Sequence, residues 1–234
     1  MSPLRFVTRW TWRLVLLALL ALAAVQFWYL GWVAYWRWEN PGETAFMQRE
    51  LARLQQKNPK AQLRHQWVPY ARISNNLKRA VIAAEDARFT VHEGVDWDAI
   101  EKAYEENLKR GRPAKGGSTI SQQLAKNLFL SSEKSYARKA QELVITYMIE
   151  FAWDKRRILE VYLNVVEWGD GVFGAEAAAR HYYGISAAQL GPEQSARLAA
   201  YLPNPKRYGR IRGGPFLDRR TEDILRYLYS VPIP

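Results

Sequence analysis

A run of glycine, hydroxyl and amide residues near the middle of the chain has the composition of an anion-binding helix start. It reads Gly116-Gly117-Ser118-Thr119-Ile120-Ser121-Gln122-Gln123-Leu124-Ala125-Lys126-Asn127. Paired glycines allow a tight turn, Ser118 or Thr119 can cap a helix, and apolar residues recur from Ile120 at helical spacing. The free amide groups of the first turn, at the positive end of the helix dipole, would suit a phosphate. The ordinary alternative is a capped helix whose amide side chains are solvated.

Glu85 is the first candidate for acid–base chemistry. It stands where a predicted helix, with Leu77 and Val81 on its apolar side, runs into a polar turn. Apolar surroundings raise the pKa of a carboxyl group, and a raised pKa suits a general base that takes a hydroxyl proton near neutral pH. A salt bridge to Arg88, three residues further on, explains the same carboxylate equally well.

Glu142 is the second candidate, because it shares a predicted helix face with Arg138 and Lys139. Two cations beside a carboxylate, with or without a divalent metal ion, could stabilise a departing pyrophosphate. An ordinary surface ion pair is the simpler alternative.

Two further patterns carry less chemistry. His92 has the side chain of a ligand or a base, but the other histidines, His65 and His181, match no metal-binding spacing. We therefore expect His92 to form hydrogen bonds that orient the turn after Glu85. The run Ser131-Ser132-Glu133-Lys134 matches the serine-x-x-lysine pattern of penicillin-binding acyl enzymes, but no lysine-threonine-glycine follows, and we interpret it as chance.

An apolar stretch from Leu14 to Trp36 predicts a membrane-spanning helix. As a helix it would rise roughly 35 Å, which is enough to cross a bilayer. Arginines precede it without acidic residues, whereas Glu39 and Glu43 follow it, so the positive-inside rule places the N-terminus in the cytoplasm. A cleavable signal peptide is the alternative, since Ala21-Leu22-Ala23 resembles a peptidase site, but the apolar stretch continues well past it.

Length and composition narrow the class of protein. The 234 residues allow one good-sized soluble domain beside the anchor, and the absence of cysteine leaves no disulfide framework. A net charge of +11 suits nucleic acid, an anionic membrane surface or a phosphorylated substrate. A membrane span with an external body argues against nucleic acid as a partner.

Helical periodicity dominates the rest of the chain, so the predicted fold class is mainly α. We expect a cytoplasmic N-terminus over 1–13, a transmembrane anchor over 14–36, a juxtamembrane linker over 37–69 and the enzyme domain over 70–234. The predicted helices cover Asn75–Ala84, Trp97–Arg110, Ile120–Leu130, Tyr136–Trp153, Lys155–Asn164, Ala175–Tyr183, Pro192–Leu202 and Leu217–Tyr229. The segment Lys109 to Lys115, rich in glycine, proline and cations, is a candidate substrate lid.

Five ordered blocks resemble glycosyltransferase family 51 of bacterial cell-wall synthesis, over roughly residues 70–205. They are Glu85-Asp86-x-x-Phe89-x-x-His92-x-Gly94-x-Asp96, Gly117-Ser118-Thr119-Ile120-x-Gln122-Gln123-x-x-Lys126-Asn127, Arg138-Lys139-x-x-Glu142, Arg157-Ile158-Leu159-Glu160-x-Tyr162-Leu163-Asn164 and Arg197-Leu198-Ala199-x-x-Leu202-Pro203. The resemblance implies a lysozyme-like, bilobed helical domain. It also implies an inverting transfer between lipid-linked cell-wall precursors, which forms a β-1,4 bond and releases polyprenyl diphosphate.

By the same resemblance Glu85 would be the base that deprotonates the acceptor hydroxyl. Glu142 would assist departure of the pyrophosphate, either directly or as ligand of a divalent cation such as Mg²⁺ or Mn²⁺, and no organic cofactor is implied. Positions matching substrate or phosphate contacts of the family are Asp86, Phe89, His92, Ser118, Thr119, Gln122, Gln123, Lys126, Asn127, Lys134, Arg138 and Lys139. The family usually has arginine where Lys134 stands, and lysine offers a point charge in place of a bidentate fork.

The implied location is the bacterial cytoplasmic (inner) membrane, crossed once, with the catalytic domain on the periplasmic side. The membrane itself and proteins of the division or elongation machinery are the further partners considered. Two other functions stay open: a lytic, lysozyme-like hydrolase and a non-enzymatic scaffold of the cell-wall machinery. A hydrolase acting on a neutral glycan has no need of the cations, and a scaffold leaves Glu85 and the glycine turn unexplained.

Overall fold

A computed structural model describes residues 3–110, 117–131, 133 and 135–234 of the chain. The chain separates into two compact units, Met1–Asn40 and Pro41–Pro234.

The first unit is a single long helix, α1 (Pro3–Tyr35). Its part from Trp10 to Tyr35 is long and apolar enough to cross a membrane, which is consistent with the predicted single-pass anchor. The helix continues without a break through the small residues at 21–23. Toward its C-terminal end the Trp28 and Trp32 rings lie 6.4 Å apart, in the aromatic-rich pattern of a segment at a membrane interface.

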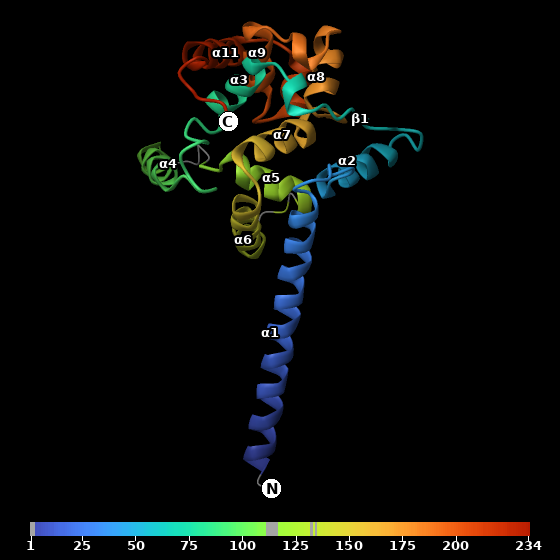
Figure 1. Cartoon of the computed structure of the whole chain (residues 1–234), viewed down its shortest axis with the longest axis vertical. Helices are drawn as coiled ribbons and strands as arrows, with labels where there is room; N and C mark the ends of the chain where they lie inside the picture. Colours follow the sequence, from blue (N-terminus) through green and yellow to red (C-terminus); the bar gives the residue numbers. More distant parts are fainter. Residues whose placement is uncertain (1–2, 111–116, 132, 134) are drawn as a thin grey trace. The chain divides into compact units, whose positions relative to one another are not determined.

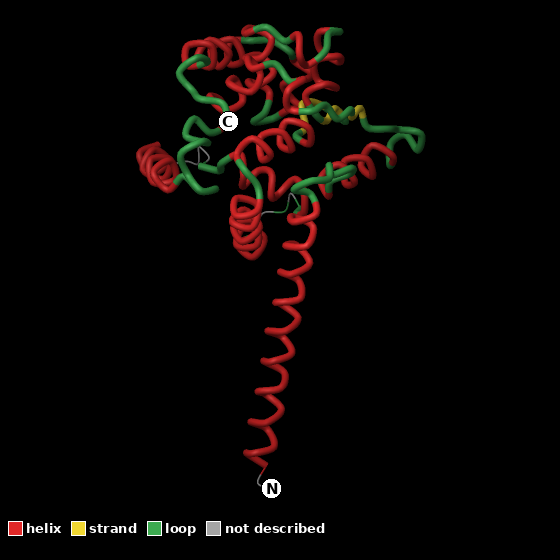
Figure 2. The backbone as a smooth tube through the Cα atoms, viewed as in Figure 1, coloured by secondary structure: helices red, strands yellow, loops and turns green. Residues whose placement is uncertain are grey.

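The second unit is built almost entirely from helices, as Figures 1 and 2 show, so the predicted mainly α fold is confirmed. Its helices are α2 (Ala45–Gln55), α3 (Asn75–Glu85), α4 (Trp97–Arg110), α5 (Ile120–Phe129), α6 (Tyr136–Ala152), α7 (Lys155–Val165), α8 (Ala175–Tyr183), α9 (Pro192–Tyr201), α10 (Pro205–Ile211) and α11 (Pro215–Tyr227), with 3-10 turns η1 (Tyr70–Arg72) and η2 (Ala187–Gln189). The strands β1 (Arg64–His65), β2 (Glu167–Gly169) and β3 (Val172–Phe173) form a small sheet in the order β1-β3-β2. β3 runs parallel to β1 and antiparallel to β2.

The helices predicted between residues 75 and 229 are present, and their ends differ from the prediction by at most two residues. Capping explains this agreement, because most of the starts are marked by local residues. Ser74 caps α3, Thr119 caps α5 and Asp154 caps α7, each accepting a hydrogen bond from a backbone amide of the first turn. Gly184 ends α8 in the left-handed conformation that glycine adopts readily.

The segment over 37–69, predicted to be a linker, contributes structure to the second unit. The compact unit begins at Pro41, whereas the predicted enzyme domain began at residue 70. Thr44 caps α2, and Met47 and Glu50 of that helix are buried. β1 adds to the sheet through the pairing of Arg64 with Val172. Two residues make a strand too short for alternation to show in a sequence, and partners more than a hundred residues away are not visible from local pattern.

The helix α10 is a further difference between the predicted and the observed elements. No helix was predicted here; Pro205 occupies the first turn of α10, where proline has no amide hydrogen bond to lose. Asn204 caps this helix by accepting a hydrogen bond from the amide of Arg207 at 3.2 Å.

Two groups of helices position the residues of interest. α3 packs against α9, and both pack against α11 (Figure 1), around buried apolar residues such as Leu77, Leu198 and Ile224. α5 packs against α6 and α7 around Leu124, Ile145 and Leu159. Glu85 is the last residue of α3, and Glu142 lies within α6, so each group of helices supplies one of the two candidate carboxylates.

Candidate active site

Glu85 lies in a pocket of side chains that buries its carboxylate and still gives it hydrogen bonds. Its side chain is only 12% exposed. Oε2 accepts a hydrogen bond from Gln123 Nε2 at 2.9 Å, and Oε1 accepts one from Arg220 Nη2 at 3.1 Å. Burial raises the pKa of Glu85, while Gln123 and Arg220 pull the pKa the opposite way. A carboxylate with this balance can accept a proton near neutral pH.

The salt bridge considered between Glu85 and Arg88 is absent from the described contacts. Arg88 pairs instead with Asp96, at 3.2 Å, and with Asp98. The Arg88 guanidinium therefore braces the polar turn that follows α3, and the partner of Glu85 comes from α11.

The side chain of Gln123 is oriented so that its amide nitrogen faces Glu85. Its Oε1 accepts a hydrogen bond from the hydroxyl of Tyr162 at 3.0 Å, which leaves Nε2 to donate to Glu85. Tyr162 is fully buried on α7, and burial raises the pKa of its hydroxyl well above the ordinary value, so it remains a donor. The three side chains form a line from α7 through α5 to the end of α3.

Arg220 is a residue of this site that the sequence analysis missed. It lies on α11, outside the five blocks, and it also donates to the backbone carbonyl of Ala84 at 3.2 Å. No local signal distinguishes it from Arg219, its immediate neighbour. Only the packing of α11 on α3 brings its guanidinium to the carboxylate.

The N-terminus of α5 is closed by side chains of the chain itself. The amide of Ile120 donates to Asp86 Oδ2 at 3.0 Å, and the amide of Gln122 donates to Thr119 Oγ1 at 3.2 Å. Thr119 and Gln122 complete a reciprocal capping box, in which the amide of Thr119 donates to Gln122 Oε1 at 3.1 Å. The amides of Thr119, Ile120 and Gln122 are thus satisfied by Gln122, Asp86 and Thr119, as in the capped-helix alternative, and phosphate binding at this helix start stays a prediction.

His92 and Asp86 fasten the turn after Glu85 to that helix start. The amide of Gly94 donates to His92 Nδ1 at 3.1 Å, so Nε2 carries the proton and donates to Asp86 Oδ1 at 2.8 Å. Thr119 Oγ1 in turn donates to the carbonyl of Gly94 at 2.6 Å. His92 orients this turn through hydrogen bonds, and the turn holds the end of α3 beside α5.

Glu142 organises a second group of charges on α6. Its carboxylate is buried, and it accepts from Arg138 Nη1 and from Lys139 Nζ, each at 2.5 Å. Lys139 Nζ lies 3.3 Å from the hydroxyl of Ser118, the exposed residue just before the cap of α5. The two cations are thus fixed by one carboxylate beside the start of α5.

Lys126 interacts electrostatically with both candidate carboxylates, Glu142 and Glu85. It lies three residues after Gln123 on α5. Burial lowers the pKa of Lys126, Glu142 and Glu85 act to raise it, and the neighbouring Arg138 and Lys139 act to lower it. α5 therefore supplies the Gln123 amide group that donates to Glu85. It also supplies the Lys126 amine, whose charge interacts with Glu85 and with the group formed by Glu142, Arg138 and Lys139.

The family model described as transglycosylase matches residues 49–228. The chain belongs to the transglycosylase family.

Proteins called biosynthetic peptidoglycan transglycosylase resemble the chain along its whole length. One from Janthinobacterium sp. (strain Marseille) is 58% identical over 234 residues, which is 100% of both chains. One from Dechloromonas aromatica (strain RCB) is 60% identical over 232 residues, covering 99% of this chain and 100% of the relative. One from Bordetella pertussis is 57% identical over 225 residues, covering 94% and 93%. The expected family is confirmed, and as one of its members the chain is a peptidoglycan glycosyltransferase.

The residues expected to contact substrate in this transglycosylase fall into two groups. Polar or charged atoms around the two carboxylates come from Ser118, Gln123, Lys126, Arg138 and Lys139. The other residues stabilise the fold around the site. Hydrogen bonds to one another or to the backbone are formed by Asp86, His92, Thr119 and Gln122. Phe89 is fully buried under the Lys155 amine, and Asn127 is buried on α5. Lys134, and the predicted lid beyond Arg110, lie outside the described residues.

The chemistry of the donor set does not favour a resident metal at Glu142. Both carboxylate oxygens already accept from cations, and no group of three or more histidine or acidic side chains among the described residues could hold a metal ion. A divalent cation would have to displace Arg138 or Lys139.

Proposed function

We propose that this transglycosylase polymerises lipid-linked disaccharide-peptide into β-1,4 glycan strands by an inverting transfer in which Glu85 is the base. The observation that carries the assignment is the environment of Glu85, a buried carboxylate with raised pKa and fixed orientation, next to a group of fixed cations. The names of the relatives support peptidoglycan as the product.

In the proposed reaction a glutamate oxygen of Glu85 takes the proton of the acceptor's sugar 4-hydroxyl. The hydroxyl oxygen attacks the anomeric carbon of the donor and forms the new bond from the opposite face. The bond between that carbon and the diphosphate oxygen breaks, and its electron pair leaves with polyprenyl diphosphate. Gln123 and Arg220 hold Glu85 in place for this step.

The cationic group supports departure of the diphosphate. Negative charge grows on the leaving oxygen as the bond breaks, and Lys126, Arg138 and Lys139 supply fixed positive charge for it. Glu142 accepts hydrogen bonds from both Arg138 and Lys139 and so holds their charged groups close together. Glu142 is therefore a positioning residue. Involvement of Mg²⁺ or Mn²⁺ stays a prediction.

α1 would anchor the enzyme in the inner membrane with residues 1–13 in the cytoplasm and the domain outside, where its lipid-linked precursors are held by their tails. Anchoring enzyme and substrates on one surface raises their effective concentration. Proteins of the division or elongation machinery remain candidate partners.

The first experiment compares wild type with Glu85→Gln in detergent, using labelled lipid-linked disaccharide-peptide. Loss of the base should reduce polymer formation by at least about 100-fold, because general-base catalysis contributes that much, while circular dichroism stays unchanged. Full activity of the variant would overturn the assigned base. Cleavage of purified cell wall by a wild type that makes no polymer would favour the lytic alternative.

A second experiment addresses the cations through Lys139→Ala, with Lys102→Ala as a control that removes one exposed lysine from α4. A charge-assisted contact is worth about 1.5–3 kcal/mol, so the KM for the donor should rise about tenfold or more in Lys139→Ala. The control should behave as wild type. Unchanged donor kinetics in Lys139→Ala would remove this lysine from the site.

A further inference from the structure

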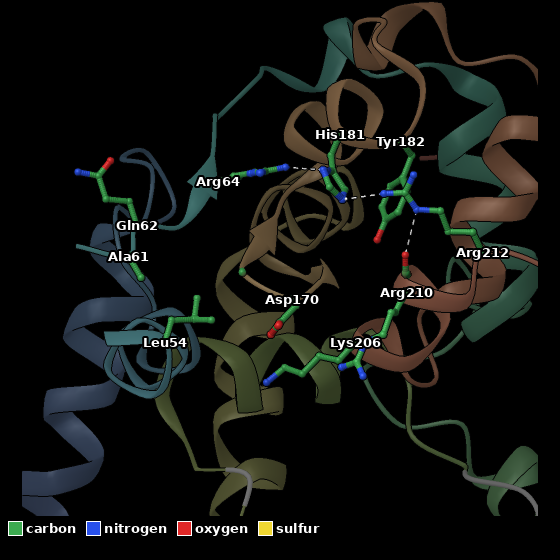
Figure 3. Close-up of a pocket in the computed structure, with 12 residues that line it drawn as sticks. Leu54, Ala61, Gln62, Arg64, Asp170, His181, Tyr182, Lys206, Arg210 and Arg212 are labelled. Atoms are coloured by element: carbon green, nitrogen blue, oxygen red, sulfur yellow. Dashed lines mark hydrogen bonds between the residues drawn. The ribbon is translucent and has the colours of Figure 1, made fainter. Parts of the chain in front are cut away.

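A cavity of about 550 Å³ lies apart from both glutamate groups. Its walls come from the segment between α2 and β1, the turn between β2 and β3, and the helices α8 and α10 (Figure 3). None of the residues placed above around Glu85 or Glu142 lines it. Its size is in the range of cavities that hold small ligands.

The cavity carries positive charge that the protein leaves unneutralised. Lys206 at its edge is paired with Glu50 at 2.5 Å, and the carboxylate of Asp170 is paired with Arg53. The remaining cations are Arg64 from β1, Arg210 from α10 and Arg212 just after α10. Within the part of the chain that the structure describes, no carboxylate lies within ion-pair distance of these three arginines.

The His181 ring lies between the guanidinium groups of Arg64 and Arg212. Figure 3 shows Arg64 and Arg212 reaching its ring from opposite sides, with Arg64 Nη1 2.5 Å from Nδ1 and Arg212 Nη2 3.3 Å from Nε2. A neutral imidazole has one acceptor nitrogen, so one guanidinium faces an N–H group instead of an acceptor. Burial and both arginines lower the pKa of His181, so protonation would worsen the conflict. An anion between the arginines would accept from both of them and relieve it.

The backbone of Arg212 is strained in a way that keeps this side chain at the cavity. Its φ is 59°, the only positive φ among the described non-glycine residues. Glycine is the usual residue at this position after a helix, and Gly213 follows immediately. A strained conformation retained at one residue points to a use for its side chain. The Arg212 guanidinium lies 5.1 Å from the centre of the Tyr182 ring, and Nε donates to the carbonyl of Gly209 at 3.2 Å.

Tyr182, which forms the wall under Arg212, is itself closely fitted. Its hydroxyl donates to the carbonyl of Trp168 at 2.9 Å. A Cβ added at Gly169 or at Gly209 would lie 2.4 or 2.2 Å from that hydroxyl oxygen, so both positions need glycine. The cavity wall is therefore a defined surface built by two segments that approach the tyrosine closely.

We propose that this cavity is a phosphate-binding site separate from the reaction centre, in which Arg64 and Arg212 bind the phosphate oxygens on either side of His181. Guanidinium groups match phosphate by paired N–H donors. Two arginines that approach His181 from opposite sides call for a compact anion with oxygens pointing in several directions, which the tetrahedral phosphate group provides and a planar carboxylate does not. Free phosphate and the headgroup of an anionic lipid share this chemistry.

The test uses the three histidines of the chain as reporters. Full-length protein labelled with ¹³C- and ¹⁵N-histidine is placed in nonionic detergent, the His181 signals are assigned with His181→Gln, and inorganic phosphate is added at constant ionic strength. A saturable shift of the His181 ring signals, with a Kd of about 1 mM or tighter, is expected. His92, which lies in the turn after Glu85, should not move.

Two variants distinguish binding from a general salt effect. Arg212→Gly removes the guanidinium and relieves the left-handed backbone, so it should fold at least as stably as wild type and bind phosphate at least about tenfold more weakly. Arg207→Gln removes an exposed arginine of α10 that does not line the cavity, and it should respond as wild type. A wild-type response in Arg212→Gly, or an equal response to acetate, would overturn the proposal.

The source of the phosphate is distinguished by nanodiscs in phosphate-free buffer. A His181 shift in phosphatidylglycerol nanodiscs, lost in Arg212→Gly, identifies a lipid headgroup. A shift with inorganic phosphate alone identifies a soluble phosphate. The absence of a His181 response in both arms would rule the site out.

Discussion

The carboxylate of Glu85 is controlled by opposing influences from three parts of the chain. Burial at the end of α3 favours the protonated form, while hydrogen bonds from Gln123 and Arg220 favour the charged form. Tyr162 orients the amide of Gln123 and thereby fixes which of its atoms meets the carboxylate. Burial is the largest of these influences, so the pKa of Glu85 is raised, which suits a base.

Removing Arg220 should therefore shift the pH dependence of the enzyme. Arg220 lowers the pKa of Glu85, so in Arg220→Gln that pKa rises and the base stays protonated to higher pH. The acid limb of the kcat/KM profile should move upward by about one pH unit or more, with activity recovering at alkaline pH.

Arg219→Gln is the matched control for this prediction, since Arg219 is exposed on the same helix and does not contact Glu85. Its profile should coincide with that of wild type. An Arg220→Gln enzyme with the wild-type acid limb would show that the arginine has no influence on the base.

At the scale of elements, the turn after α3 and the start of α5 form one structural unit. Asp86 accepts from His92 and from the amide of Ile120, and the hydroxyl of Thr119 donates to the carbonyl of Gly94. These bonds hold the end of α3, which carries Glu85, against α5, which carries Gln123 and Lys126. The distance between the base and its partners therefore depends on side chains that do not themselves reach substrate.

Asp86→Ala should destabilise the domain, because the donors of His92 and Ile120 both lose their acceptor. A buried donor without a partner costs about 1–3 kcal/mol, so the free energy of unfolding should fall by roughly 2–4 kcal/mol. Urea denaturation measures the change. Asp98→Ala, which removes an exposed carboxylate of α4 that pairs with Arg88, should cost less than about 1 kcal/mol. Equal effects of the two substitutions would contradict this role of Asp86.

At the scale of the whole molecule, anchor and enzyme domain are separate compact units. The sheet of the second unit and its packed helices all come from Pro41–Pro234. In the proposed function, the anchor contributes by placing the domain at the membrane.

A chain of residues 41–234 should accordingly fold by itself and polymerise detergent-dispersed precursor at close to the full-length rate. On precursor embedded in vesicles its rate should fall by about 100-fold, because the encounter is no longer confined to a surface. Thermal unfolding and polymer formation under both conditions measure this. A truncated domain that fails to unfold cooperatively, or one equally active on vesicles, would contradict the division of roles.

Most helices, a long apolar helix of membrane-spanning length and the placement of Glu85 at a helix end could be predicted from the sequence. Helix caps such as Ser74 and Asp154, and the apolar spacing between them, act over a few residues and are visible in the sequence. Glu85 was expected at a helix end and is the last residue of α3. The ordered blocks also indicated the family, which the comparisons confirmed.

The contacts of those residues could not be predicted from local sequence, because they join segments far apart in the chain. The partner of Glu85 is Arg220, 135 residues away, and not the nearby Arg88. The amide of Ile120, at the start of α5, donates to Asp86, 34 residues away, where the sequence suggested phosphate. The arginines around His181 come from β1 and the end of α10, segments that local pattern did not connect. Such contacts depend on which helices pack together, and the packing free energy is spread over many apolar residues that no short motif encodes.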